Sequence, residues 1–166
     1  MQLIFTGTRK NLSEVQVEII ENALVPYLSY RWHVGDCPTG VDAWVRSANP
    51  EAIVYRKLSL EEMKNPAIRS KRMIDEALLL SGEKVLLSFP DRDCPSGCKP
   101  SSSFSGKGSG TWGTTAYAYH GKDCKVLVFP LVPVHSPSWY EIPAECSGEN
   151  WLQPEPVYEQ LSLFSL

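Results

Sequence analysis

A glycine-rich stretch, FSGKGSGTWGTTAYAYHG, is the first feature of this sequence that could do chemistry. Gly108, Gly110 and Gly113 fit the spacing G-x-G-x-x-G, and Ser109 and Thr111 add hydroxyl groups where a helix is predicted to begin. A helix N-terminus exposes unpaired backbone N–H groups and the positive end of its dipole, and glycine lets an anion approach closely. The stretch therefore predicts a phosphate-binding turn, with a surface turn and tight helix packing as the alternative.

Three other stretches carry groups that suit the same ligand, and each is predicted to follow a strand. They are residues 7–9, residues 35–42 and the segment that leads to Arg69. Arginine supplies a bidentate fork for phosphate. An aspartate just inside a helix could accept hydrogen bonds from ribose hydroxyls or brace the neighbouring loops. The residues that we expect at the ligand site are Gly7, Thr8, Arg9, Gly35, Gly40, Asp42, Arg69, Gly108, Ser109, Gly110 and Thr111.

Each of these residues also has a structural explanation. Arg69 could pair with Glu61 or Glu62, and Asp42 could act only through the helix dipole as a first-turn residue. The glycine loop is not a P-loop, since no Gly-Lys-[Ser/Thr] stands at the required spacing, and a dinucleotide fingerprint would follow the first strand. The histidines have no nucleophile partner, so no hydrolytic triad is visible and the catalytic residues stay unknown.

The polar loop before the glycines contains possible metal ligands. Cys94 and Cys98 could bind zinc, but their spacing is looser than that of a zinc knuckle and no second C-x-x-C pair exists. Further ligands would come from Cys37, Cys124 or His135. Asp91 and Asp93 suit a hard cation, although a solvated acidic loop is the default. We expect no metal and no cofactor, and we expect this loop to form a lid or rim over the site.

The composition is that of one globular domain. The chain has 166 residues and a net charge of −3, which argues against a nucleic-acid protein that relies on a strongly basic surface. No apolar run is long enough to cross a membrane, and the start MQLIFTGTR lacks the features of a signal peptide. Five irregularly spaced cysteines favour reduced thiols. We therefore expect a cytoplasmic protein with no membrane partner.

Apolar runs of strand length alternate with segments of helical periodicity. The predicted strands are 3–7, 32–35, 51–58, 84–90 and 125–132, and the predicted helices are 11–28, 38–48, 67–81 and one that starts near Gly110. This rhythm predicts a three-layer, Rossmann-like α/β fold with a mostly parallel five-strand sheet. Ligands of such sheets bind beyond the carboxyl ends of the strands, which is where the four stretches above would meet.

Residues 131–166 differ in character from the rest of the chain. They are rich in proline, show no clear period, and contain Trp139, Tyr140, Trp151 and Tyr158. We expect an irregular C-terminal tail that packs on the domain of residues 1–130 or on a partner copy, which makes a homodimer possible.

Three motifs occur in order: G-x-x-x-x-G-V-D at 35–42, I-R-S-K-R-M at 68–73 and S-G-T-W-G-T at 109–114. Together they resemble the SLOG superfamily of Rossmann-like nucleotide-binding domains, most of all its small YspA/YpsA-type members. That family pairs a G-x-x-x-x-G-[AV]-D turn with an I-R-N-x-x-M helix start and a P-G-G-x-G-T loop. The resemblance covers about residues 1–130. It implies a nucleotide site lined by Gly7, Gly35, Gly40, Asp42, Arg69, Gly108, Gly110 and Thr111.

The chain departs from the family pattern at important positions. Ser70 replaces the family's Asn, and the short P-G-G loop is expanded to PDRDCPSGCKPSSSFSGKGSGT. The related LOG enzymes carry glutamates after this loop, whereas Gly113 and Thr114 stand here and cannot act as acid or base. The resemblance thus favours binding or sensing of a nucleotide. The alternative is a LOG-like nucleotide N-glycosidase that uses Asp42 or Glu62; DprA-like binding of single-stranded DNA is favoured least.

Overall fold

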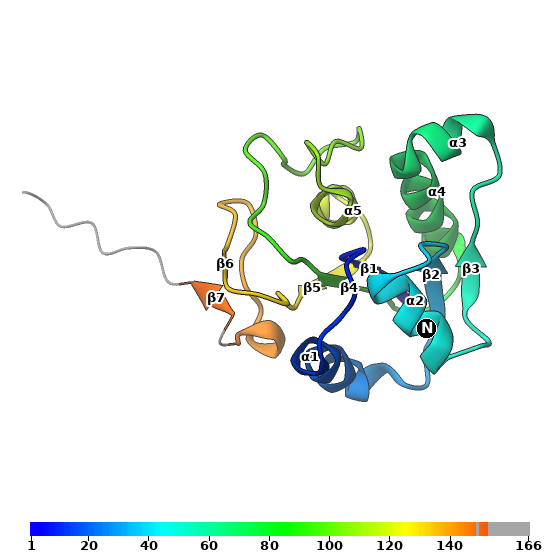
Figure 1. Cartoon of the computed structure of the whole chain (residues 1–166). Coiled ribbons are helices and arrows are strands. Elements are labelled where there is room, and N and C mark those ends of the chain that lie inside the picture. The colour runs from blue at the N-terminus through cyan, green and yellow to red at the C-terminus, as the bar shows by residue number, and fades with distance from the viewer. Residues whose placement is uncertain (149, 153–166) are drawn as a thin grey trace, which may run out of the picture.

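A five-stranded parallel sheet forms the centre of this computed structural model, which describes residues 1–148 and 150–152. The strands are β1 (Gln2–Gly7), β2 (Arg31–Gly35), β3 (Ile53–Tyr55), β4 (Lys84–Phe89) and β5 (Lys125–Val128). Their order in the sheet is β3-β2-β1-β4-β5, and all neighbours are parallel (Figure 1). The predicted α/β fold with a parallel five-strand sheet is confirmed.

Helices cover both faces of the sheet. They are α1 (Glu14–Leu24), α2 (Gly40–Ala48), α3 (Leu60–Lys64), α4 (Pro66–Leu79) and α5 (Gly110–Tyr119), with a 3₁₀ turn η1 (Val25–Tyr27) after α1. Figure 1 shows α4 and α5 on one face of the sheet and α1 on the other. This layering follows from right-handed crossovers, because the chain moves outward from β1 to β3 and then returns across the sheet to β4.

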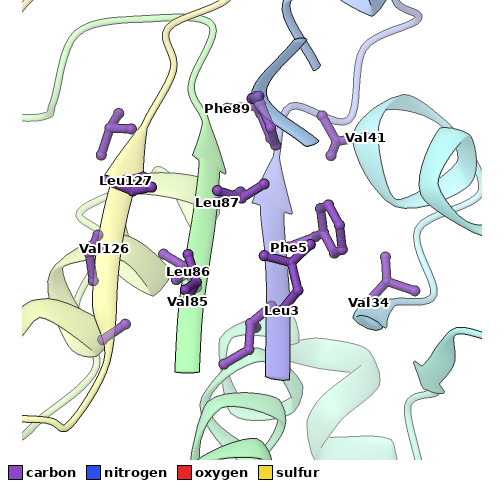
Figure 2. Packing of buried hydrophobic residues seen from close by; sticks show 14 of the residues in the cluster. Leu3, Phe5, Val34, Val41, Val85, Leu86, Leu87, Phe89, Val126 and Leu127 are labelled. Carbon is purple, nitrogen blue, oxygen red and sulfur yellow. The ribbon is translucent and has the colours of Figure 1, made fainter. Parts of the chain in front are cut away.

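The two central strands are buried on both faces, which explains their continuous apolar sequences. Leu3 and Phe5 of β1 and Leu87 of β4 are fully buried and lie together in the core that Figure 2 shows. β1 pairs with β4 along its whole length, from Gln2 beside Lys84 to Gly7 beside Phe89. The carboxyl ends of β1 and β4 therefore lie side by side at the point where the strand order reverses.

The predicted boundaries differ from the observed ones in several places. The first helix begins at Glu14, after the capping residue Ser13, whose side chain accepts a hydrogen bond from the N–H of Gln16. Val15, in the first turn of α1, is 67% exposed. The strand predicted over 51–58 is reduced to three residues at the edge of the sheet. The chain before α4 forms the short helix α3, which periodicity could not reveal because it has only five residues.

The segment after β5 packs on the domain with little regular structure. It holds β6 (Val134–His135), a 3₁₀ turn η2 (Ala144–Cys146) and β7 (Trp151–Leu152). Tyr140 and Trp151 are buried and stack on each other, so this part of the predicted tail covers the core of the same chain. Tyr158 lies outside the described residues. Among the helices of residues 1–148 and 150–152, none has the length and apolar character needed to cross a membrane.

Candidate functional site

A cavity of about 220 Å³ opens at the carboxyl ends of β1 and β4. This is the switch point of the sheet, where α/β folds of this kind bind their ligands. Of the residues predicted for the site, all but Gly35 and Gly40 line this cavity. They are Gly7, Thr8, Arg9, Asp42, Arg69, Gly108, Ser109, Gly110 and Thr111.

The N-terminus of α5 forms one wall of the cavity. The Ser109 side chain caps this helix by accepting a hydrogen bond from the Trp112 N–H at 3.2 Å. Within the described part of the chain, the N–H groups of Gly110 and Thr111 donate no hydrogen bond, as expected for the first turn of a helix. A Cβ added at Gly110 would meet only the Arg9 guanidinium, 3.9 Å away, so the space beside this residue is open.

Gly108 allows the backbone to turn into this helix. Its φ of +93° belongs to the left-handed region that favours glycine, and a Cβ at this position would contact nothing within 4 Å. The glycines of the G-x-G-x-x-G spacing therefore have different roles. Gly113 packs against the loop instead, since a Cβ there would lie 2.7 Å from the Gly106 Cα atom and 2.8 Å from the Phe104 ring.

Arg69 forms the inner wall with two aspartates. The residue is only 4% exposed, and its Nη2 atom lies 3.6 Å from Asp42 Oδ2 and 3.7 Å from Asp36 Oδ1. The alternative pairing with Glu61 or Glu62 does not occur; it is Arg72 that binds Glu62, with Nε 2.9 Å from Oε1. Among the described residues the Arg69 Nε group has no hydrogen-bond partner, although it is buried.

The environment shifts the pKa values of Asp42 and Asp36 in opposite directions. Burial raises the pKa of Asp42, and the nearby Arg69 guanidinium opposes that shift only in part. Burial alone would raise the pKa of Asp36 too. Its pKa is lowered overall, because the Lys57 backbone N–H donates to Asp36 Oδ2 at 3.0 Å and because the Arg69 charge is nearby. Both carboxylates compete for one guanidinium, so this wall offers hydrogen-bond acceptors rather than excess positive charge.

Gly35 and Gly40 support the site without lining the cavity. A Cβ at Gly35 would lie 1.6 Å from Arg69 Nη1, so only glycine lets the guanidinium cross the end of β2. Gly40 has a φ of +70°, and a Cβ there would lie 2.0 Å from the Thr8 carbonyl oxygen. These glycines serve close packing.

The outer rim of the cavity is basic. Arg9 and Lys10 follow β1, and Arg92 follows β4. Lys10 Nζ lies 2.8 Å from Asp91 Oδ2, and Arg92 Nε lies 3.4 Å from Asp91 Oδ1. Burial alone would raise the pKa of Asp91, but Lys10 and Thr8 lower it. The Arg9 side chain is exposed and forms no ion pair within the residues that the structure covers.

Two tryptophans anchor the loop that supplies part of this rim. Trp112 Nε1 donates to the Arg92 carbonyl oxygen at 2.8 Å, and Trp139 Nε1 donates to the Cys98 carbonyl oxygen at 2.9 Å. Their rings meet edge to face, with centroids 6.1 Å apart. The loop is thus a fixed rim. Sequence reasoning missed this anchoring, because the sequence does not show which acceptor an indole N–H will find.

The other chemistry considered from the sequence is not assembled here. The cysteines are free, and among residues 1–148 and 150–152 no group of three or more His, Cys, Asp or Glu side chains is placed to hold a metal ion. At the positions of the LOG glutamates, Gly113 is packed against the loop. Thr114 is 1% exposed and donates to the Gly110 carbonyl oxygen at 2.8 Å. Neither residue lines the cavity.

Comparison with family models, with curated proteins and with solved structures finds no match for this chain.

Proposed function

We propose that this protein binds or senses a nucleotide or a nucleotide-derived ligand and holds its phosphate at the N-terminus of α5. One observation carries the proposal: Gly110 and Thr111, whose N–H groups donate no hydrogen bond within the described residues, line the same cavity as Arg9, which forms no ion pair there. Helix N–H groups and an arginine together are a common phosphate site. The resemblance of the motifs to the SLOG superfamily supports the same ligand class.

The charges of the site suggest different roles for its two arginines. Arg69 is already shared between Asp36 and Asp42, so its role is to orient the Asp42 carboxylate. Arg9 is exposed and unpaired within the described chain, so it is the better partner for a phosphate at Gly110. Asp42 would then accept hydrogen bonds from ligand hydroxyls, as a ribose provides.

An N-glycosidase is the second candidate, and one feature of Asp42 favours it. This carboxyl group lines the cavity, and burial raises its pKa, as is common for acids that donate a proton in catalysis. Incubation with nucleoside monophosphates, NAD and ADP-ribose, followed by detection of free base, tests this activity. Base release that is lost in Asp42→Asn would favour the enzyme over the binding protein.

Location and assembly belong to the same proposal. Free cysteines suit a cytoplasmic protein. A homodimer would cover apolar side chains that are exposed on α1, on η1 and directly after η1, namely Val15, Val25 and Leu28, which are 65–67% exposed. Light scattering at micromolar concentration tests the dimer, and a monomeric mass would contradict it.

Gly110→Val tests phosphate binding at α5. The added side chain fits the open space at this position, so the fold should persist, but it covers the N–H groups that face the cavity. Loss of a hydrogen bond to a charged group, worth about 1.5–3 kcal/mol, weakens binding about ten- to hundredfold. Calorimetric titration with nucleoside mono- and diphosphates, NAD and ADP-ribose measures the change.

Gly148→Val is the matched control, because a Cβ at Gly148 also meets nothing within 4 Å and the residue does not line the cavity. It should bind like the parent protein. If Gly110→Val also binds normally, or if it unfolds, the glycines serve packing and the phosphate site at α5 is wrong.

A further inference from the structure

The rim of the cavity carries more positive charge than one phosphate at α5 requires. The cavity as a whole is lined by four basic side chains and two carboxylates. Arg69 and Asp42 form the inner wall, which leaves Arg9, Lys10 and Arg92 on the rim against the single carboxylate of Asp91. The rim therefore keeps a net positive charge after its internal ion pairs are counted.

The arrangement of these groups directs that charge outward. The Asp91 side chain is only 10% exposed, whereas those of Lys10 and Arg92, which flank it, are 69% and 58% exposed. Within the described part of the chain, Lys10 and Arg92 each make one contact with this carboxylate, so most of their donors stay unpaired there. They therefore offer donors to an anion at the rim, in the cavity that Arg9 and Gly110 also line.

The rim cations and the N-terminus of α5 border the same cavity. Arg9 Nη2 lies 3.9 Å from the place of a Cβ at Gly110, and Lys10 follows directly in the chain. Arg69, on the inner wall, adds no free cation to this set, because its guanidinium is shared between Asp36 and Asp42. The basic groups thus continue from the helix N-terminus to the loop after β4.

The size and lining of the cavity indicate what reaches the rim. Its volume of about 220 Å³ is below the roughly 300–1,000 Å³ that enclose a complete small ligand, so part of the ligand extends over the rim. Phe5 is the one aromatic residue among the lining side chains, so the rim has no platform for stacking a base. An anionic group suits it better.

We infer that the ligand carries a second phosphate next to the first, as in a nucleoside diphosphate or a diphosphate-linked nucleotide, and that Arg92 and Lys10 bind this second phosphate. The inference rests on the proposed function. Arg92 is the specificity-determining residue, because the Trp112 indole holds its backbone carbonyl against α5 and so fixes its position relative to the first phosphate.

The test compares mono- and diphosphates of adenosine, guanosine, cytidine and uridine by calorimetry, at one ionic strength and with EDTA. The parent protein should bind the diphosphate of its preferred nucleoside at least tenfold more tightly than the monophosphate. Arg92→Gln should lower diphosphate affinity about tenfold and change monophosphate affinity less than threefold. Arg31→Gln, at the amino end of β2, removes the same charge far from the cavity and should change neither.

The outcomes separate the two proposals. Equal affinity for mono- and diphosphates, or equal loss of both in Arg92→Gln, overturns the second phosphate position and leaves the nucleotide site standing. An equal effect of Arg31→Gln shows that only net charge matters, which also overturns it. If none of the nucleotides binds, the proposed function itself is wrong.

Discussion

Acidification from pH 7 to pH 4.5 should destabilise the fold by about 2 kcal/mol through His33 alone. This side chain is fully buried on β2. Gln2 donates its amide N–H to the Ser81 carbonyl at 3.0 Å, which turns its oxygen toward His33 Nε2 at 2.9 Å. His33 Nδ1 lies 3.1 Å from the Tyr55 hydroxyl and accepts from it. The ring is thus held neutral, with its proton on Nε2.

The direction of the effect follows from the pKa of this group. Burial, helped by the charge of Arg31, lowers the pKa of His33 to about 4, whereas in the unfolded chain it stays near 6.5. Between these two values the unfolded chain binds more protons, so stability falls as pH falls. Complete passage through this window costs about 3 kcal/mol, of which about 2 kcal/mol is lost by pH 4.5.

Urea unfolding of the parent protein and of His33→Gln at pH 7 and pH 4.5 measures this cost. Aspartates with lowered pKa values, such as Asp36 and Asp91, also destabilise the fold in acid, but they are present in both proteins. The difference between the two pH dependences therefore isolates His33. The variant should be less stable at pH 7 and should lose about 2 kcal/mol less on acidification. Identical losses in both proteins would refute the neutral, buried histidine.

Two further predictions concern the supports of the cavity. Gly40→Ala should reduce the free energy of unfolding by about 3 kcal/mol. Alanine is disfavoured there because φ is +70° and because the new Cβ would lie 2.0 Å from the Thr8 carbonyl oxygen. Chemical denaturation measures this loss. Trp139→Phe should cost about 1–2 kcal/mol and increase proteolytic cleavage within 91–107, because the Cys98 carbonyl loses its donor; unchanged cleavage would mean that the loop is anchored elsewhere.

The fold could be predicted because its signals are local and repeated. Each central strand is a short apolar run, and each long helix has both a capping residue and an apolar face. The alternation of strands and helices then leaves few topologies. Short elements were predicted less well because their signals are weak. The edge strand β3 has only three residues of the longer strand predicted there, and α3, which has five residues, was not predicted.

Which residues line the cavity was also largely predictable, because residues after parallel strands must gather at one edge of the sheet. Which side chains pair with each other around the cavity could not be predicted. For Arg69 the partners considered from the sequence were Glu61 and Glu62, which are close in the chain, whereas the structure pairs it with the distant Asp36 and Asp42. Only the three-dimensional structure decides between them, because the guanidinium crosses the end of β2 instead of following its own helix.

The roles of the glycines also could not be predicted from the sequence, because glycine serves two purposes in this site. At Gly35 and Gly40 a Cβ would overlap a side chain or a backbone carbonyl, whereas at Gly110 it would enter open space before unpaired N–H groups. Sequence spacing cannot separate these cases, because both require the absence of a side chain. Measurements of stability can separate these cases. Substitutions at Gly35 or Gly40 should lower ligand binding only together with the free energy of unfolding. Substitution at Gly110 should lower ligand binding alone. Loss of binding without loss of stability therefore identifies a glycine that faces the ligand.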